Sequence, residues 1–450
     1  MSNLISGVFS FKEENYSFVL EGQKVRLVDA PFKTLKFCSD MEEVPCIRGV
    51  TSGNRDILFL KCRFNARLPF SDFAFSIAGY LLSTSNTGYS HSFEFNRISF
   101  YSDAINTFYS PQNALDIQFD FDNWDGSAHI HVKPFFETQI QFSFNQDRVE
   151  FNMDRWFFER KEPTRIGSVE TSFSVYCNEK KQPTEIEKYY FAIYDFLCFA
   201  NYTLNISFNK VYLFSKNEKG KDERIASAHI FSNHSNYEND EYTTITSREI
   251  PPEKLGKLFA KVASLRGKDQ RLPFYYPPNR NEARLIDSGK WLVTAICFEG
   301  LFEDTFPHFK TESNPVFQKI KELVVAKTEE IDNDGFSKKE QKYLENFKNH
   351  INRYEGVLEE KFNHVFNSHK TVLEKILEGN ERRYNVAHDT NYGNQYMIYR
   401  NKLAHGTVEP LGENEIAVYR LLCPMIYAMI LQKDFSENEI SNMISKIFSS

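Results

Sequence analysis

Residues 140–151, IQFSFNQDRVEF, carry apolar side chains at alternate positions, with Phe142 and Phe144 in the first half and Val149 and Phe151 in the second. A repeat of two residues is that of a β-strand, whose successive side chains point to opposite faces of a sheet. The stretch therefore predicts two strands that bury one face and leave the other in water. This division is typical of an antiparallel sheet.

The same alternation recurs throughout residues 1–162. Ile117, Phe119 and Phe121 alternate with a polar set made of Asp116, Gln118, Asp120 and Asp122. Asp125-Gly126 is a dipeptide that favours a hairpin turn. Aromatic residues, which favour strands, form 15% of the 450 residues. We therefore expect residues 1–162 to form an antiparallel β domain, either a sandwich or a barrel.

Residues 163–285 have a mixed pattern, which we interpret as an α/β segment and a linker. Thr184 and Glu187 have the spacing of a helix-capping box and predict a helix over 189–200. The other expected elements are strands at 173–176, 204–214 and 225–231, a charged loop at 216–224, a helix at 251–265 and a basic, proline-rich linker at 266–285.

From residue 286 to 450 the apolar repeat changes to that of an α-helix, beginning with Ile286, Leu292, Ile296 and Leu301. Two further capping boxes, Ser337 with Glu340 and Ser436 with Glu439, mark helix starts, and other helices are expected at 315–328, 372–377, 394–404 and 413–431. The fold class predicted for the whole chain is α+β, a β-rich N-terminal region followed by an all-α bundle.

Composition and missing motifs exclude several classes of protein. The net charge of −7 excludes a strongly basic nucleic-acid-binding arm, and the sequence has no glycine-rich phosphate loop and no H-E-x-x-H or G-x-S-x-G motif. The seven cysteines include no C-x-x-C pair, which argues against a zinc ribbon and a disulfide framework. We found neither a signal peptide nor a run of 18 apolar residues, so we expect a cytoplasmic protein without a membrane partner.

One segment, residues 399–406 with the sequence YRNKLAHG, has the residue types of phosphodiester chemistry. Arg400 can bind a phosphate through two parallel hydrogen bonds, and a histidine such as His405 can transfer a proton near neutral pH. Five residues along a helix separate two side chains by about 140°. We therefore expect a helix break at 404–406 to turn His405 back toward Arg400. By spacing alone, an ion-paired arginine and a helix-terminal histidine are the better explanation of the segment.

The complete string R-N-x3-H-G, closing a helix of an all-α domain, resembles the R-x4–6-H motif of the HEPN superfamily. Residues 291–302, WLVTAICFEGLF, resemble the first helix of the HEPN domain in ApeA-type anti-phage proteins, which also place an aromatic-rich β domain first. The resemblance implies that Arg400 binds the scissile phosphate, that His405 is the general acid or base, and that Asn401 orients one of them. It implies a metal-independent endoribonuclease without a cofactor, acting as a homodimer or higher homo-oligomer through the helical domain.

The ApeA-type resemblance also implies a setting. The nuclease would act in anti-phage defence by abortive infection, cleaving host RNA, most naturally tRNA, to 2′,3′-cyclic phosphate and 5′-hydroxyl ends. The β-rich region would sense an unknown phage-derived trigger or regulate the nuclease. The alternative is a non-catalytic HEPN interaction or dimerisation module that carries a ligand-binding β-sandwich.

Other charged residues have weaker assignments. Glu299 shares a helix face with apolar residues and needs a partner, for which Arg400 is the candidate, although a carboxylate on the bundle rim explains it equally. Lys402, Arg382 and Arg383 are candidate RNA-binding residues, together with lysines at 338, 339 and 342. We interpret the histidines at 129, 131 and 388 and the acidic stripe at 116, 120 and 122 as surface residues, so no metal site is expected.

Overall fold

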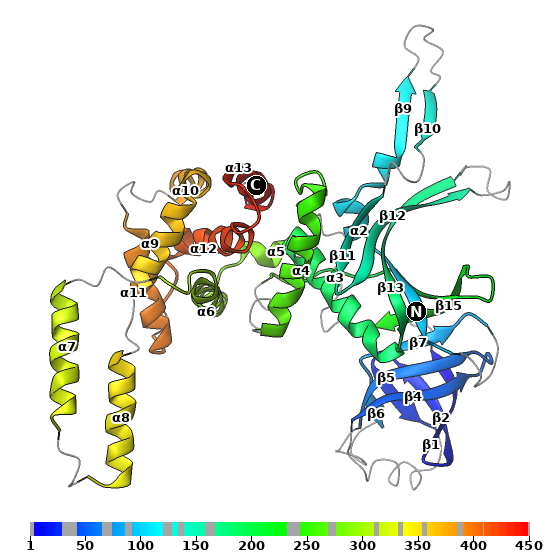
Figure 1. Cartoon of the computed structure of the whole chain (residues 1–450), viewed down its shortest axis with the longest axis horizontal. Helices are drawn as coiled ribbons and strands as arrows, with labels where there is room; N and C mark the ends of the chain where they lie inside the picture. Colours follow the sequence, from blue (N-terminus) through cyan, green and yellow to red (C-terminus); the bar gives the residue numbers. More distant parts are fainter. Residues whose placement is uncertain are drawn as a thin grey trace. The chain divides into compact units, whose positions relative to one another are not determined.

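The computed structural model divides the chain into two compact units, Met1–Ala283 and Arg284–Ser450, each of which is considered by itself (Figure 1). The structure describes residues 4–28, 43–64, 74–85, 92–119, 128–133, 139–157, 167–231, 244–268, 276–309, 315–331, 336–352, 358–384, 390–407 and 409–448. The domain boundary expected after residue 162 lies inside the first unit. The α+β class is confirmed, with a β-rich first unit and a helical second one.

Six strands of the first unit close into a barrel. They are β1 (Ile5–Phe11), β2 (Glu14–Glu21), β3 (Lys24–Leu27), β4 (Val44–Thr51), β5 (Asp56–Phe64) and β6 (Phe75–Ser76). The pairings β1–β2, β2–β3, β3–β6, β6–β5, β5–β4 and β4–β1 complete the ring. Phe9, Phe18, Phe59 and Phe75 fill the interior, and Phe18 meets Phe59 edge to face at a centroid distance of 5.1 Å. Of the sandwich and the barrel, the structure has the barrel.

The sheet continues beyond the barrel from β5 in the order β7, β15, β14, β8, β13, β12, β11. These strands are β7 (Gly79–Ser83), β15 (Asp222–Ile230), β14 (Lys210–Lys216), β8 (Phe95–Tyr101), β13 (Gly167–Lys181), β12 (Asp147–Phe157) and β11 (Ile140–Phe144). The pair expected within residues 140–151 is confirmed as β11 and β12, with Ile140 opposite Phe151. The expected wet face is not found on β12, where Glu150 and Asn152 are buried. A separate pair, β9 (Leu115–Phe119) and β10 (Ala128–Val132), flanks the predicted turn Asp125-Gly126, which lies outside the described residues.

Helices cover the apolar face of this extension. They are α2 (Asp103–Phe108), α3 (Ile186–Asn201) and α4 (Pro252–Lys268), with short 3-10 turns η1 (Pro111–Ala114) and η3 (Pro183–Glu185). Phe173 of β13 contacts Phe196 of α3 and Phe259 of α4 at centroid distances of 6.4 and 5.5 Å. Figure 1 shows α4 beside β11, as their contacts require.

Three local predictions for residues 163–285 need correction. The capping box uses Gln182 and Glu185, since the Glu185 carboxylate accepts from the Gln182 N–H at 2.8 Å and α3 begins at Ile186. The box predicted at Thr184 and Glu187 was wrong by two residues because Pro183 starts the first turn. The charged loop is shorter than predicted, since β14 and β15 extend into it, and α4 and α5 (Arg280–Arg284) occupy parts of the expected linker.

The second unit is helical: most of its helices pack around the apolar helix α12, while α7 and α8 contact each other. The helices are α6 (Ser288–Thr305), α7 (Pro315–Glu329), α8 (Lys338–Asn352), α9 (Leu358–Ser368), α10 (Lys370–Tyr384), α11 (Tyr392–Ala404), α12 (Glu413–Leu431) and α13 (Glu437–Phe448). Helix α12 contacts α6, α10, α11 and α13. By length and composition α12 could cross a membrane, but 78% of its apolar window is buried inside the unit, as in a core helix.

Both predicted capping boxes of the second unit are confirmed. The Glu340 carboxylate accepts from the Ser337 N–H at 2.8 Å, and the Glu439 carboxylate accepts from the Ser436 N–H at 2.7 Å. These contacts satisfy backbone donors that a helix start otherwise leaves without partners. The helix predicted over 413–431 has the same bounds as α12.

Candidate active site on helix α11

Helix α11 is fixed in the bundle by aromatic side chains on its inner face. Tyr396 and Tyr399 are buried, and both contact Trp291 of α6, at centroid distances of 5.7 and 4.9 Å. The Trp291 indole N–H donates to the backbone oxygen of Glu415 at 3.1 Å, and the Tyr399 hydroxyl lies 3.2 Å from the Ser288 hydroxyl. This packing sets the direction in which the remaining faces of α11 point.

Arg400 lies at the edge of this packed face and is held by Glu299 of α6. Arg400 Nε donates to Glu299 Oε1 at 2.8 Å, and Arg400 Nη2 donates to Glu299 Oε2 at 2.9 Å. The Tyr396 hydroxyl donates to the same Oε1 at 3.1 Å. The hydrogen bonds that Arg400 donates to Glu299 raise the pKa of Arg400, and burial, followed by the Glu299 charge, raises the pKa of Tyr396. The carboxylate on the apolar helix face therefore has its expected partner.

The guanidinium of Arg400 keeps donors for another ligand. Of its five N–H bonds, Glu299 takes one on Nε and one on Nη2, which leaves the two on Nη1 and one on Nη2. The Arg400 side chain is 27% exposed and the Glu299 side chain 18%. The guanidinium edge that points away from Glu299 can therefore donate to two oxygens of a phosphate, in the geometry that arginine favours.

Helix α11 ends at Ala404, as expected from the sequence, and His405 is its C-cap residue. The His405 N–H still donates to the Asn401 oxygen at 3.1 Å, and the chain turns only at Gly406, where φ is +79°. Gly406 N donates to the Leu403 oxygen and Thr407 N to the Lys402 oxygen, both at 3.0 Å, which is a Schellman ending. Because the His405 N–H still bonds within the helix, helix geometry places its side chain about 140° around the axis from Arg400 rather than back toward it.

The outer face of α11 carries Asn401 and His405, one turn apart, together with Ile398. All three are exposed, and the Ile398 side chain is an apolar group left in water. The His405 imidazole makes no hydrogen bond or ion pair with the described part of the chain. It is available to a ligand or to another protein chain.

The remaining candidates are dispersed. Lys402 Nζ donates a hydrogen bond to Glu409 Oε2 at 2.7 Å. This contact raises the pKa of Lys402 and reduces its availability to RNA. Arg382 and Arg383 lie in the last turn of α10, but their side chains are outside the described set, as is His388. The lysines at 338, 339 and 342 lie on exposed positions of α8.

The two histidines of β10 share one face, and the backbone pairing places His129 opposite Gln118 and His131 opposite Asp116. Their side chains, and all of Asp120 and Asp122, lie outside the described residues. Within the described ranges, no group of three His, Cys, Asp or Glu side chains is arranged to hold a metal ion.

Sequence reasoning missed Tyr396, although its position one turn before Arg400 was a signal that it shares the same helix face.

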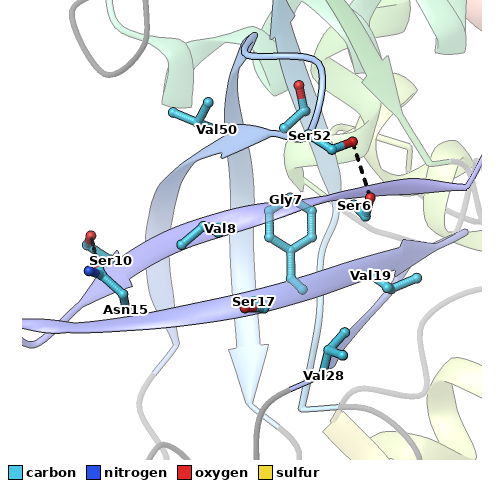
Figure 2. A pocket seen from close by; sticks show the side chains of 12 residues that line it. Ser6, Gly7, Val8, Ser10, Asn15, Ser17, Val19, Val28, Val50 and Ser52 are labelled. Atoms are coloured by element: carbon cyan, nitrogen blue, oxygen red, sulfur yellow. Dashed lines mark hydrogen bonds between the residues drawn. The ribbon is translucent and has the colours of Figure 1, made fainter.

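The first unit carries a hollow of a different chemical character on the barrel surface (Figure 2). It has a volume of about 800 Å³ and is lined by small polar and aliphatic residues of β1, β2 and β4, including Ser6, Val8, Ser17 and Val50. Gly7 lies in its floor, where a Cβ would come within 2.1 Å of the Val50 oxygen. The lining includes no titratable side chain, so this hollow can bind a ligand but has no group for acid–base catalysis.

Comparisons of this chain with protein-family models, curated proteins and solved structures find no match. The residues of helices α6 and α11 are therefore the basis for assigning a function.

Proposed function

We propose that the helical unit is a metal-independent endoribonuclease whose site is built from Arg400, His405 and Asn401. The observation that carries the proposal is the Arg400 guanidinium, which Glu299 holds by one edge while the other edge keeps donors for a phosphate. A clamped arginine is a preorganised anion site, because its orientation is fixed before the phosphate arrives. Exposed His405 lies beyond it at the end of the same helix.

In the proposed reaction the ribose 2′-oxygen attacks the adjacent phosphorus, and the bond from phosphorus to the 5′-oxygen breaks. The 2′-hydroxyl loses a proton and the departing 5′-oxygen gains one, which leaves a 2′,3′-cyclic phosphate and a 5′-hydroxyl. His405 transfers one of these protons, and Arg400 stabilises the charge that develops on the phosphate. The reaction needs RNA, because DNA lacks the nucleophile.

A single chain directs Arg400 and His405 about 140° apart, so we propose that two copies complete one site. Arg400 of one protomer would then bind the phosphate, and His405 of the other protomer would transfer a proton at that same phosphate. The exposed Ile398 lies on the same face as Asn401 and His405, and burying it would favour such a contact.

We further propose, from the resemblance to ApeA-type HEPN proteins, that the substrate is host tRNA and that the setting is abortive infection. Anticodon loops fit the chemistry, since their unstacked bases and free 2′-hydroxyls are accessible. In this proposal the β-rich unit regulates the nuclease in response to a phage-derived trigger.

The test is a mixing experiment with two inactive variants. His405→Ala and Arg400→Ala are each expected to lower RNA cleavage by about 10²–10⁴-fold. His405→Ala removes an exposed side chain and should change stability by less than about 0.5 kcal/mol. If the site is shared, mixing the two variants and allowing exchange restores cleavage to about a quarter of the parental rate, because half of the dimers carry one intact site.

The opposite results are equally clear. Cleavage by His405→Ala at the parental rate refutes the role of the histidine. Inactivity of the mixture, with exchange verified by a labelled chain, refutes the shared site while leaving a site within one chain. Sequencing the fragment ends of total RNA identifies the substrate and shows whether a cyclic phosphate forms.

A second candidate function, a ligand-binding module without catalysis, is favoured by the 800 Å³ hollow on the barrel. In that case Arg400 and Glu299 would serve only to hold α6 and α11 together. Complete absence of RNA cleavage, with ligand-dependent stabilisation that Val8→Glu abolishes, would favour this candidate.

A further inference from the structure

The face of the extended sheet opposite α3 and α4 carries a row in which arginines and aromatic rings alternate. The row consists of Arg148 on β12, Tyr176 on β13, Arg97 on β8, Phe214 on β14 and Arg224 on β15. Backbone register fixes the alignment, since each residue is the direct partner of the next across four strand pairs. We call these five residues the arginine–aromatic row.

The side chains of the row lie against one another. The Arg97 guanidinium carbon is 3.7 Å from the centroid of the Phe214 ring and 5.4 Å from that of Tyr176. Arg148 lies 4.5 Å from the Tyr176 centroid. Arg224 lies 4.7 Å from the centroid of Tyr212, the neighbour of Phe214 along the same face of β14. Cations and π faces are thus presented together along one line.

The residues next to the row are small and polar, and their side chains are buried. Ser174 and Ser99, direct partners in the next register position, share a hydrogen bond of 2.7 Å. The opposite face of the same strands is the apolar core beneath α3, where Phe173 and Phe100 are fully buried. The two end arginines, Arg148 and Arg224, are exposed, so the row reaches solvent at its ends.

The row also has unused hydrogen-bond donors. Arg97 Nη1 pairs with Asp222 at 3.0 Å, whereas its buried Nε has no hydrogen-bond partner in the described structure. Arg148 uses Nε for Glu150 at 2.7 Å, and its side chain is 56% exposed. The exposed Arg224 guanidinium has no ion pair or hydrogen bond among the described residues. Both ends of the row therefore offer free guanidinium N–H groups.

We propose that the arginine–aromatic row binds nucleotides of single-stranded RNA, with bases stacking on its rings and guanidinium planes and phosphates held by its end arginines. Strands lie about 4.8 Å apart, so five strands extend the row over about 19 Å, enough for more than one nucleotide. Stacking platforms beside cationic groups are the usual basis of single-strand binding. The choice of RNA rests on the proposed function, while the binding surface lies on the other unit of the chain.

The test is fluorescence anisotropy with a labelled ten-nucleotide RNA and the full chain carrying His405→Ala, so that the probe is not cut. Arg224→Ala is expected to raise Kd by about fivefold or more, and to lower the slope of log Kd against log salt by about 0.7, the value for one phosphate contact on a single strand. Arg224→Lys should retain the slope. Phe214→Leu should raise Kd by at least about fivefold through lost stacking.

The matched control is Arg63→Ala, which removes an arginine that is 76% exposed and paired with Glu43 on the barrel. It should bind RNA as the parent does. Competition with a mononucleotide shows whether a free nucleotide or an RNA strand is the ligand, and either one supports the row if Arg224→Ala weakens it.

Parental binding by folded Arg224→Ala and Phe214→Leu overturns the proposal, as does the absence of RNA binding at low salt. Cleavage without binding at the row leaves the proposed nuclease intact. Binding at the row without cleavage leaves the present inference intact and refutes the nuclease.

Discussion

The contact between Arg400 and Glu299 supports a prediction that separates folding from catalysis. Arg400→Ala removes both hydrogen bonds to the Glu299 carboxylate and leaves that group, 18% exposed, with the Tyr396 hydroxyl. Glu299→Gln removes the charge while keeping the shape and an oxygen for Tyr396. The first variant should therefore destabilise the helical unit more than the second.

The magnitude follows from the burial of the pair. Removing one partner of a fully buried ion pair costs about 3–5 kcal/mol, and an exposed pair contributes about 0.2–1 kcal/mol. With side chains 27% and 18% exposed, Arg400 and Glu299 lie between these limits. We expect Arg400→Ala to cost about 2 kcal/mol. For a unit of this size that corresponds to a fall in Tm of about 4–8 °C.

The assay is urea unfolding of the full chain, followed by circular dichroism of the helical signal, with the single variants and the double variant Arg400→Ala/Glu299→Gln. The double variant should lose less than the sum of the singles, because each single already breaks the pair. Arg400→Lys keeps the charge but loses the two parallel hydrogen bonds. A folded and inactive Lys variant supports phosphate binding.

Strict additivity of the two single variants, with no coupling between them, would refute the reasoning. So would an Arg400→Ala protein as stable as the parent, since the carboxylate would then not need the guanidinium. Full RNA cleavage by Arg400→Lys would show that a point charge suffices and that the fork has no role.

Three further outcomes are expected. RNA cleavage should persist in excess EDTA, because the proposed chemistry needs only Arg400 and His405; loss in EDTA and recovery with Mg²⁺ would contradict it. The pKa of His364 is lowered by burial, and its ring packs on Phe306 at a centroid distance of 4.7 Å. The unfolded chain therefore binds this proton more readily, so stability falls as pH drops below about 6.5; His364→Gln should reduce that pH dependence, measured by urea unfolding. Ile398→Glu should weaken self-association and cleavage together without lowering Tm, as followed by light scattering, and a dimeric but inactive variant would count against the proposed interface.

Local chemistry explains what could be predicted from the sequence. The Ser337 and Ser436 boxes depend on residues three positions apart, and the strands of residues 140–151 on alternation within a few residues. The contact of Glu299 with Arg400 followed from a carboxylate that needed a partner on an apolar helix face. The capping-box and strand inferences used neighbours along the chain, whereas the Glu299 inference matched a carboxylate on α6 with a candidate arginine on α11.

The features that could not be predicted from the sequence depend on contacts between residues far apart in the chain. Barrel closure needs β1 to pair with β4 and β3 with β6, and no local pattern distinguishes those partners from others. The arginine–aromatic row exists only once five strands are in register, since its members are spread between positions 97 and 224. The direction of the His405 side chain could not be predicted, because a break within residues 404–406 can come before or after His405. The chain turns at Gly406, after His405, which keeps the histidine on its helical face.

That last difference changes how activity should depend on protein concentration. A general acid or base works only within about 2.6–3.2 Å of the proton it transfers. In one chain His405 faces water, about 140° around the helix from the clamped Arg400. Association of two chains would supply both the missing arginine and the exclusion of water, and Ile398 lies on the face that would be covered. The rate per chain should therefore rise with protein concentration and reach a plateau when association is complete. For the proposed nuclease, control of association would then be a direct means of control over its activity.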